Sequence, residues 1–149
     1  MPAMPAKTAS CLCGGVKLEI HGAPLMQNLC HCSSCQKFTG AVFGSMAAYK
    51  AEQVTLTESE PSLLKTFVDK TPESGGVLKR SFCGNCGSPV KVLSSTAPGN
   101  VVVPVGIIDG DKDAFRPQME FYCRAKADWV GAIENVKTFD AMPPTDPPQ

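Results

Sequence analysis

The chain has 149 residues, and its 14 lysines and arginines balance its 14 aspartates and glutamates, so the formal net charge is zero. Nucleic acids and anionic membranes are bound by clustered positive charge, so we expect neither as a partner. With 43% hydrophobic and 19% charged residues, the chain suits one folded domain with its own core.

The sequence shows neither a membrane span nor an export signal. No stretch approaches the roughly 18 continuous apolar residues that a spanning helix requires, and the first ten residues lack an apolar signal segment. We therefore expect a cytoplasmic protein. Thiols stay reduced in that compartment, so the eight cysteines favour metal binding over disulfides.

Both ends of the chain are poor in residues that could build a core. Residues 1–9 are mostly small and include two prolines, and residues 142–149 include four. Such segments bury too little surface to offset the entropy lost on ordering. We expect flexible segments at 1–9 and 142–149 around one domain, residues 10–141.

Apolar and polar residues alternate in short runs, the pattern of half-buried strands joined by turns. The predicted fold is therefore mainly β. Pro104 lies inside the last run, which indicates an edge strand or a bulge there, because proline donates no backbone hydrogen bond. The predicted strands cover residues 16–20, 53–57, 64–68, 77–82 and 100–109.

Two segments are candidates for helix. Residues 33–38 fit a single turn directly after Cys32. Further along, Trp129, Ile133 and Val136 stand at helical spacing, although Gly131 weakens that pattern.

Seven of the eight cysteines form three clusters. Two thiolates separated by one or two intervening residues can turn toward one ion at about 2.3 Å, and nearby backbone amides donate to their charged sulfurs. This spacing is typical of zinc knuckles. The clusters are Cys11 with Cys13, Cys30 with Cys32 and Cys35, and Cys83 with Cys86.

Ligand counting separates two kinds of site. Cys11, Cys13, Cys83 and Cys86 sum to the four thiolates of a closed structural zinc site. The remaining three thiolates, from Cys30 to Cys35, leave one coordination position open, which distinguishes catalytic zinc from structural zinc. The sequence predicts two zinc ions per chain, one of each kind.

Other interpretations of the cysteines stay open at this point. Four disulfides would use all eight cysteines, but a bridge between Cys11 and Cys13 is strained. A rubredoxin-type iron centre favours two C-x-x-C pairs, which the Cys11 pair does not match. Cys123 could complete the three-cysteine site, although it reads more simply as a small buried side chain. His31 lies between two ligands, and in extended backbone its ring faces away from the metal.

The order of these clusters closely resembles the glutathione-dependent formaldehyde-activating enzyme family. The resemblance covers roughly residues 9–142. The matching motifs are Cys11-Leu-Cys-Gly-Gly-Val16, Cys30-His-Cys-Ser-Ser-Cys35 followed by Gly40, Phe82-Cys-Gly-Asn-Cys-Gly-Ser88, Gly106-Ile-Ile-Asp109 and Trp129.

The resemblance implies a β-tent fold, in which small antiparallel sheets lean together over zinc knuckles. It assigns the structural zinc to Cys11, Cys13, Cys83 and Cys86, and the catalytic zinc to Cys30, Cys32 and Cys35. One position departs from the family. The residue after Cys35 is often arginine there and is Gln36 here, which removes a bidentate donor suited to a carboxylate of glutathione.

The implied activity is a carbon–sulfur lyase or synthase reaction like that of S-(hydroxymethyl)glutathione synthase. Metal binding deprotonates a thiol, so a zinc-held thiolate would add to an aldehyde. The implied partner is a small-molecule substrate, with glutathione as one candidate. Two alternatives remain: a related zinc enzyme that acts on another small electrophile or specialised metabolite, and a non-enzymatic zinc-binding interaction module.

Overall fold

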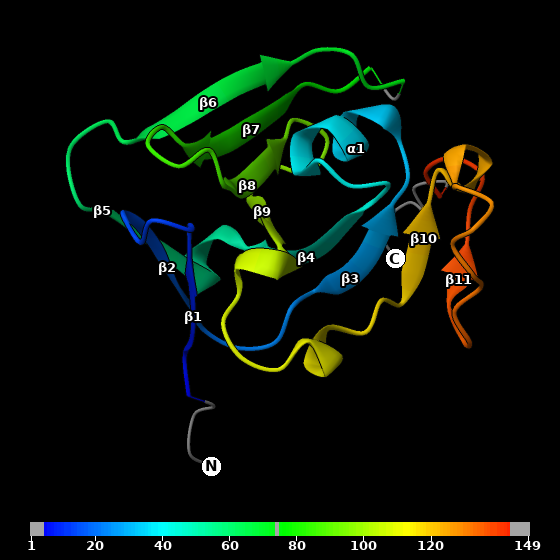
Figure 1. The fold of residues 1–149 in the computed structure, drawn as a ribbon, viewed down its shortest axis with the longest axis horizontal. Coiled ribbons are helices and arrows are strands. Elements are labelled where there is room, and N and C mark those ends of the chain that lie inside the picture. The colour runs from blue at the N-terminus through cyan, green and yellow to red at the C-terminus, as the bar shows by residue number, and fades with distance from the viewer. Residues whose placement is uncertain (1–4, 74, 144–149) are drawn as a thin grey trace.

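A computed structural model describes residues 5–73 and 75–143, and they fold into two β-sheets with one short α-helix (Figure 1). The smaller sheet is antiparallel, in the order β1 (Lys7–Ser10), β2 (Val16–Ile20), β5 (Val54–Glu58). The larger sheet has the order β11 (Lys137–Thr138), β10 (Met119–Phe121), β3 (Met26–Cys30), β4 (Gly44–Lys50), β9 (Asn100–Pro104), β8 (Pro89–Ser94), β7 (Leu78–Cys83), β6 (Leu64–Asp69).

The prediction of a mainly β fold is confirmed. The larger sheet is mixed rather than purely antiparallel, because β10 pairs in parallel with both β3 and β11. Within the described residues, no helix is long and apolar enough to span a bilayer. Four 3-10 turns connect the strands: η1 (Ala51–Gln53), η2 (Val105–Ile107), η3 (Lys112–Phe115) and η4 (Cys123–Ala125).

Strands β2, β5, β6 and β7 lie within one residue of their predicted bounds. The observed strand in the predicted range 100–109 is shorter than predicted, because β9 ends at Pro104 and the 3-10 turn η2 follows it. The prediction of an edge strand or a bulge at Pro104 is wrong, because β9 lies inside the sheet between β4 and β8. Proline is accommodated there as the last residue of the strand, where the ladder stops.

The helix predicted at 33–38 is confirmed as α1 (Ser33–Thr39). Gly40, with φ of 69°, ends it in the left-handed conformation. The prediction of a helix at 129–136 is wrong, since turns and irregular backbone occupy that segment. Asn135 has φ of 63°, which interrupts a right-handed helix, and Trp129 is 76% exposed.

The start of the folded region differs from the boundary expected at residue 10. Strand β1 begins at Lys7 and pairs with β2, and the Thr8 hydroxyl donates to Asp109 at 2.7 Å. Of the expected flexible ends, residues 1–4 and 144–149 lie outside the described residues.

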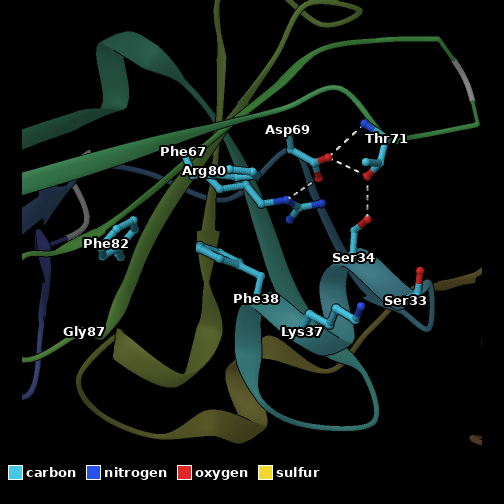
Figure 2. A pocket seen from close by; sticks show the side chains of 10 residues that line it. All are labelled: Ser33, Ser34, Lys37, Phe38, Phe67, Asp69, Thr71, Arg80, Phe82 and Gly87. Atoms are coloured by element: carbon cyan, nitrogen blue, oxygen red, sulfur yellow. Dashed lines mark hydrogen bonds and ion pairs between the residues drawn. The ribbon is translucent and has the colours of Figure 1, made fainter.

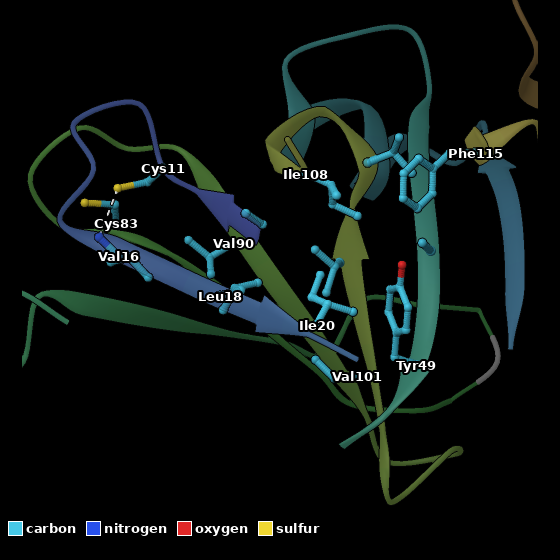
Figure 3. Close-up of a cluster of buried hydrophobic side chains, with 14 of the residues drawn as sticks. Cys11, Val16, Leu18, Ile20, Tyr49, Cys83, Val90, Val101, Ile108 and Phe115 are labelled. Carbon is cyan, nitrogen blue, oxygen red and sulfur yellow. Dashed lines mark hydrogen bonds between the residues drawn. The ribbon is translucent and has the colours of Figure 1, made fainter. Parts of the chain in front are cut away.

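The two sheets enclose the main hydrophobic core (Figure 3). Side chains alternate between the faces of β4: Ala47 and Tyr49 join this core, whereas Met46 packs toward α1 on the opposite face. Burial on both faces matches the four apolar residues in the centre of β4, Met46 to Tyr49. The core also contains residues of β2 and two of the cysteines: Val16, Leu18, Ile20, Cys11 and Cys83.

Candidate metal centres

The four-cysteine cluster joins the segment after β1 to the end of β7. Sulfur ligands of Cys11, Cys13, Cys83 and Cys86 all lie within 4.8 Å of one another. The Sγ atoms of Cys11 and Cys13 are 3.6 Å apart, and those of Cys13 and Cys83 are 3.7 Å apart. A tetrahedral zinc with 2.3 Å bonds requires sulfurs about 3.8 Å apart. The cluster could therefore hold a metal ion, and its geometry is compatible with zinc.

Tight turns bring these sulfurs together. The amide of Gly14 donates to the Cys11 carbonyl at 3.0 Å, and the amide of Gly87 donates to the Cys83 carbonyl at 2.8 Å. Both glycines have φ of 77°, a conformation that other residues rarely adopt. Ser88 links the two turns, since its Oγ accepts from the Leu12 amide at 2.9 Å and lies 3.2 Å from Cys86 Sγ. Hydrogen bonds, first of all from the Ser88 hydroxyl and also from backbone amides, lower the pKa of Cys86 to about 5.

The three-cysteine cluster lies where β3 passes into α1. Cys30 ends β3, Cys32 caps the helix, and Cys35 lies in its first turn. The sulfurs lie within 4.8 Å of one another, and those of Cys30 and Cys32 are 3.3 Å apart. Hydrogen bonds from the thiols of Cys30 and Cys35 lower the pKa of Cys32 to about 2. A stabilised thiolate among converging sulfurs suits a soft divalent cation, and zinc is compatible with this donor set.

Among the described residues, no fourth His, Cys, Asp or Glu belongs to this three-sulfur group. Cys123 lies apart from it and points its Sγ at the Glu120 carbonyl, 3.6 Å away. The structure therefore does not support Cys123 as a fourth ligand. All eight cysteines are free thiols.

His31, between Cys30 and Cys32, belongs to a buried polar network instead of the sulfur group. Its Nε2 lies 2.9 Å from Glu120 Oε1, and Lys126 Nζ donates to the same oxygen at 3.0 Å. His31 and Glu120 are fully buried. Burial raises the pKa of Glu120, but hydrogen bonds from His31 and Lys126 outweigh it and hold the pKa below its usual value. The expectation that His31 faces away from the sulfurs agrees with this geometry.

Gln36 holds the backbone of the same turn. Its Nε2 donates to the His31 carbonyl at 2.9 Å, and its amide donates to the Cys32 carbonyl at 3.0 Å. From the sequence, Gln36 is notable only because it stands where the family often has an arginine that could donate to a carboxylate. In the structure, Gln36 fixes the carbonyl that lies between two candidate ligands, and His31 with Glu120 fixes the side chain there.

Arg80 and Asp69 form a buried ion pair beside Cys35, with Nε and Oδ2 2.8 Å apart. Burial lowers the pKa of Arg80, but Asp69 and the charge of Cys35 outweigh it and raise the pKa above its ordinary value. Sequence reasoning missed this pair. The signal was present in β7, where Arg80 occupies an inward position of the alternating pattern, between Leu78 and Phe82.

A cavity of about 570 Å³ lies between α1 and the β6–β7 pair (Figure 2). The guanidinium of Arg80 lies 5.3 Å from the centre of the Phe38 ring. Asp69 Oδ1 accepts from the Thr71 hydroxyl at 2.6 Å, and that hydroxyl lies 3.2 Å from Ser34 Oγ. Arg80 thus lines the cavity and also adjoins the three-cysteine cluster.

We predict that Glu120→Ala lowers the free energy of unfolding by about 3–5 kcal/mol, because it leaves His31 and Lys126 without their buried acceptor. The matched control is Glu19→Ala. Glu19 pairs with His21 at 2.7 Å, but both side chains are more than half exposed, so its loss should cost about 0–1 kcal/mol. Denaturant unfolding at fixed zinc concentration measures both, and equal losses would contradict the assigned role of the buried network.

Comparison with known proteins agrees with this architecture. A crystal structure of a Rhodobacter sphaeroides protein superposes with a TM-score of 0.57 at 22% sequence identity, over 74% of this chain and 96% of the other. A search of curated proteins found no match. The family model described as glutathione-dependent formaldehyde-activating enzyme matches residues 6–125. The chain therefore belongs to the glutathione-dependent formaldehyde-activating enzyme family.

Proposed function

We propose that the chain is a cytoplasmic zinc-dependent enzyme of the carbon–sulfur lyase class that joins a thiol to an aldehyde. The reaction resembles that of S-(hydroxymethyl)glutathione synthase, and its reverse releases the two reactants. The observation that carries the proposal is the group of three sulfurs with no fourth protein ligand atom among the described side chains. A pure interaction module needs a closed four-sulfur site and has no use for an open one.

The two clusters take different roles in this proposal. Cys11, Cys13, Cys83 and Cys86 would hold a structural zinc, because their four sulfurs complete a tetrahedron. The catalytic zinc would be held by Cys30, Cys32 and Cys35. When bound there, zinc supplies an open coordination position and favours the ionised form of an incoming thiol.

The bond changes of the reaction balance without another reactant. The thiol sulfur bonds to the aldehyde carbon, the carbon–oxygen double bond becomes single, and the thiol proton ends on that oxygen. Because bound zinc would already favour the ionised thiol, the main task of the surrounding residues is to position the reactants.

Residues around the three-cysteine cluster serve that positioning. Gln36 and the network of His31 and Glu120 fix the turn that carries Cys30 and Cys32. Arg80 places a paired positive charge beside Cys35, which offsets the negative charge of a three-thiolate site. These contacts hold the turn that carries the sulfurs, and none of them adds a fourth ligand atom among the described residues.

We predict about two zinc ions per chain in freshly purified protein, measured by elemental analysis. Cys35→Ser should leave a folded chain with about one, whereas Cys86→Ser should prevent soluble folding, because structural zinc can contribute on the order of 10 kcal/mol. Cys123 lies outside both clusters, so Cys123→Ser is the matched control and should keep both ions. If Cys35→Ser unfolds the chain and Cys86→Ser spares it, the two roles are exchanged.

We predict that the zinc-loaded chain accelerates the exchange between glutathione, formaldehyde and their adduct. Exchange NMR at equilibrium suits this measurement, because the uncatalysed addition is already fast. Cys35→Ser should return the exchange to the background rate, and Cys123→Ser should match the natural chain. A zinc-loaded chain with no acceleration would contradict glutathione and formaldehyde as the reactants.

A further inference from the structure

The cavity between α1 and β6–β7 adjoins the three-cysteine cluster through a shared residue. Helix α1 carries Cys35 on its buried side and contributes Ser34, Lys37 and Phe38 to the cavity wall. Arg80 lines the cavity and also interacts with the side chain of Cys35. At about 570 Å³, the cavity lies within the range of about 300–1,000 Å³ that is typical of small-molecule sites.

Three phenylalanine rings define the apolar part of the cavity: Phe38 from α1, Phe67 from β6 and Phe82 from β7. Phe67 pairs directly with Arg80 across the two strands, so both side chains lie on the cavity face. Phe67 is nevertheless 63% exposed. A ligand ring placed against it would bury apolar surface that the folded chain leaves in water.

The polar groups of the cavity are mostly engaged with one another. Asp69 accepts from Arg80 and Thr71, and Thr71 contacts Ser34 (Figure 2). Lys37 differs: throughout residues 5–73 and 75–143, its ammonium group makes no hydrogen bond or ion pair. The cavity therefore offers one uncommitted positive charge beside three aromatic rings.

We propose that this cavity binds a small aromatic carboxylate that carries an aldehyde group, with its ring against Phe67 and its carboxylate near Lys37. The assignment rests on the proposed function, because this molecule would be the electrophile that reacts at the three-cysteine cluster. The three rings and the single free ammonium group of the cavity match an aromatic monocarboxylate better than glutathione, which has two carboxylates, an ammonium group and no ring. Glutathione or another thiol would approach the sulfurs separately.

Calorimetric titration of 4-formylbenzoate into the zinc-loaded full chain tests this assignment. We expect saturable binding, and weaker binding of benzaldehyde, which lacks the carboxylate. Phe67→Ala should raise the Kd about tenfold through loss of ring contact. Lys37→Gln should raise it about two- to fivefold and remove most of its dependence on salt.

Two substitutions on the opposite face of the same strands are matched controls. Val68 and Lys79 pair with each other across β6 and β7, and alternation turns both away from the cavity. Val68→Ala and Lys79→Gln should leave the Kd unchanged. The proposal is overturned if 4-formylbenzoate shows no saturable binding, or if Phe67→Ala and Lys37→Gln bind it as well as the two controls do.

The outcomes separate this assignment from the proposed function. Binding that depends on Phe67 and Lys37, in a chain that accelerates no thiol addition, would support the cavity and contradict the reaction. Acceleration that depends on Cys35, in a chain that does not bind 4-formylbenzoate, would support the reaction and overturn the cavity assignment.

Discussion

The convergence of four sulfurs from distant parts of the chain is the constraint on which the fold depends. Cys13 and Cys83 are 70 residues apart in sequence, and their sulfurs are 3.7 Å apart. Cys11 and Cys83 are also buried members of the main core. Thiolates placed this close repel one another unless a cation lies between them, so the free energy of metal binding becomes part of the free energy of folding. A metal ion bound by these four sulfurs would therefore stabilise the junction of the two sheets.

The three-cysteine cluster is supported in a different way. Its sulfurs lie outside the main core, in a small group with Met46 on the α1 side of the larger sheet. Gln36 donates to the His31 carbonyl and Glu120 accepts from the His31 ring, so hydrogen bonds hold this turn and its shape depends less on a bound ion. In the proposed function, a turn held in this way would keep its geometry while ligands exchange at the open position of the zinc.

The sequence analysis succeeded where the information is local. Cysteine spacing identified the individual knuckles, and alternation located β2, β5, β6 and β7, because knuckles and strands are set by neighbouring residues. Counting ligands then joined the Cys11 and Cys83 knuckles, although they are 70 residues apart. It failed where distant segments decide the outcome. The ion pair of Asp69 with Arg80 and the parallel pairing of β10 with β3 bring together residues that no local pattern relates. At 129–136, apolar spacing suggested a helix, but the left-handed backbone at Asn135 interrupts it.

The position of Arg80 relates the chemistry of the cluster to the choice of substrate. Its charge is divided between Asp69 and the Cys35 side, so it stabilises the sulfur site and has little left to attract an anion. In this proposal a carboxylate is recognised by Lys37, which lies on the exposed side of α1, the helix that also carries Cys35. An aldehyde as small as formaldehyde would leave the phenylalanine rings uncovered, whereas an aromatic substrate would bury them and be held beside the cluster. Selectivity among aldehydes would thus come from a wall of the cavity that the sulfurs do not touch.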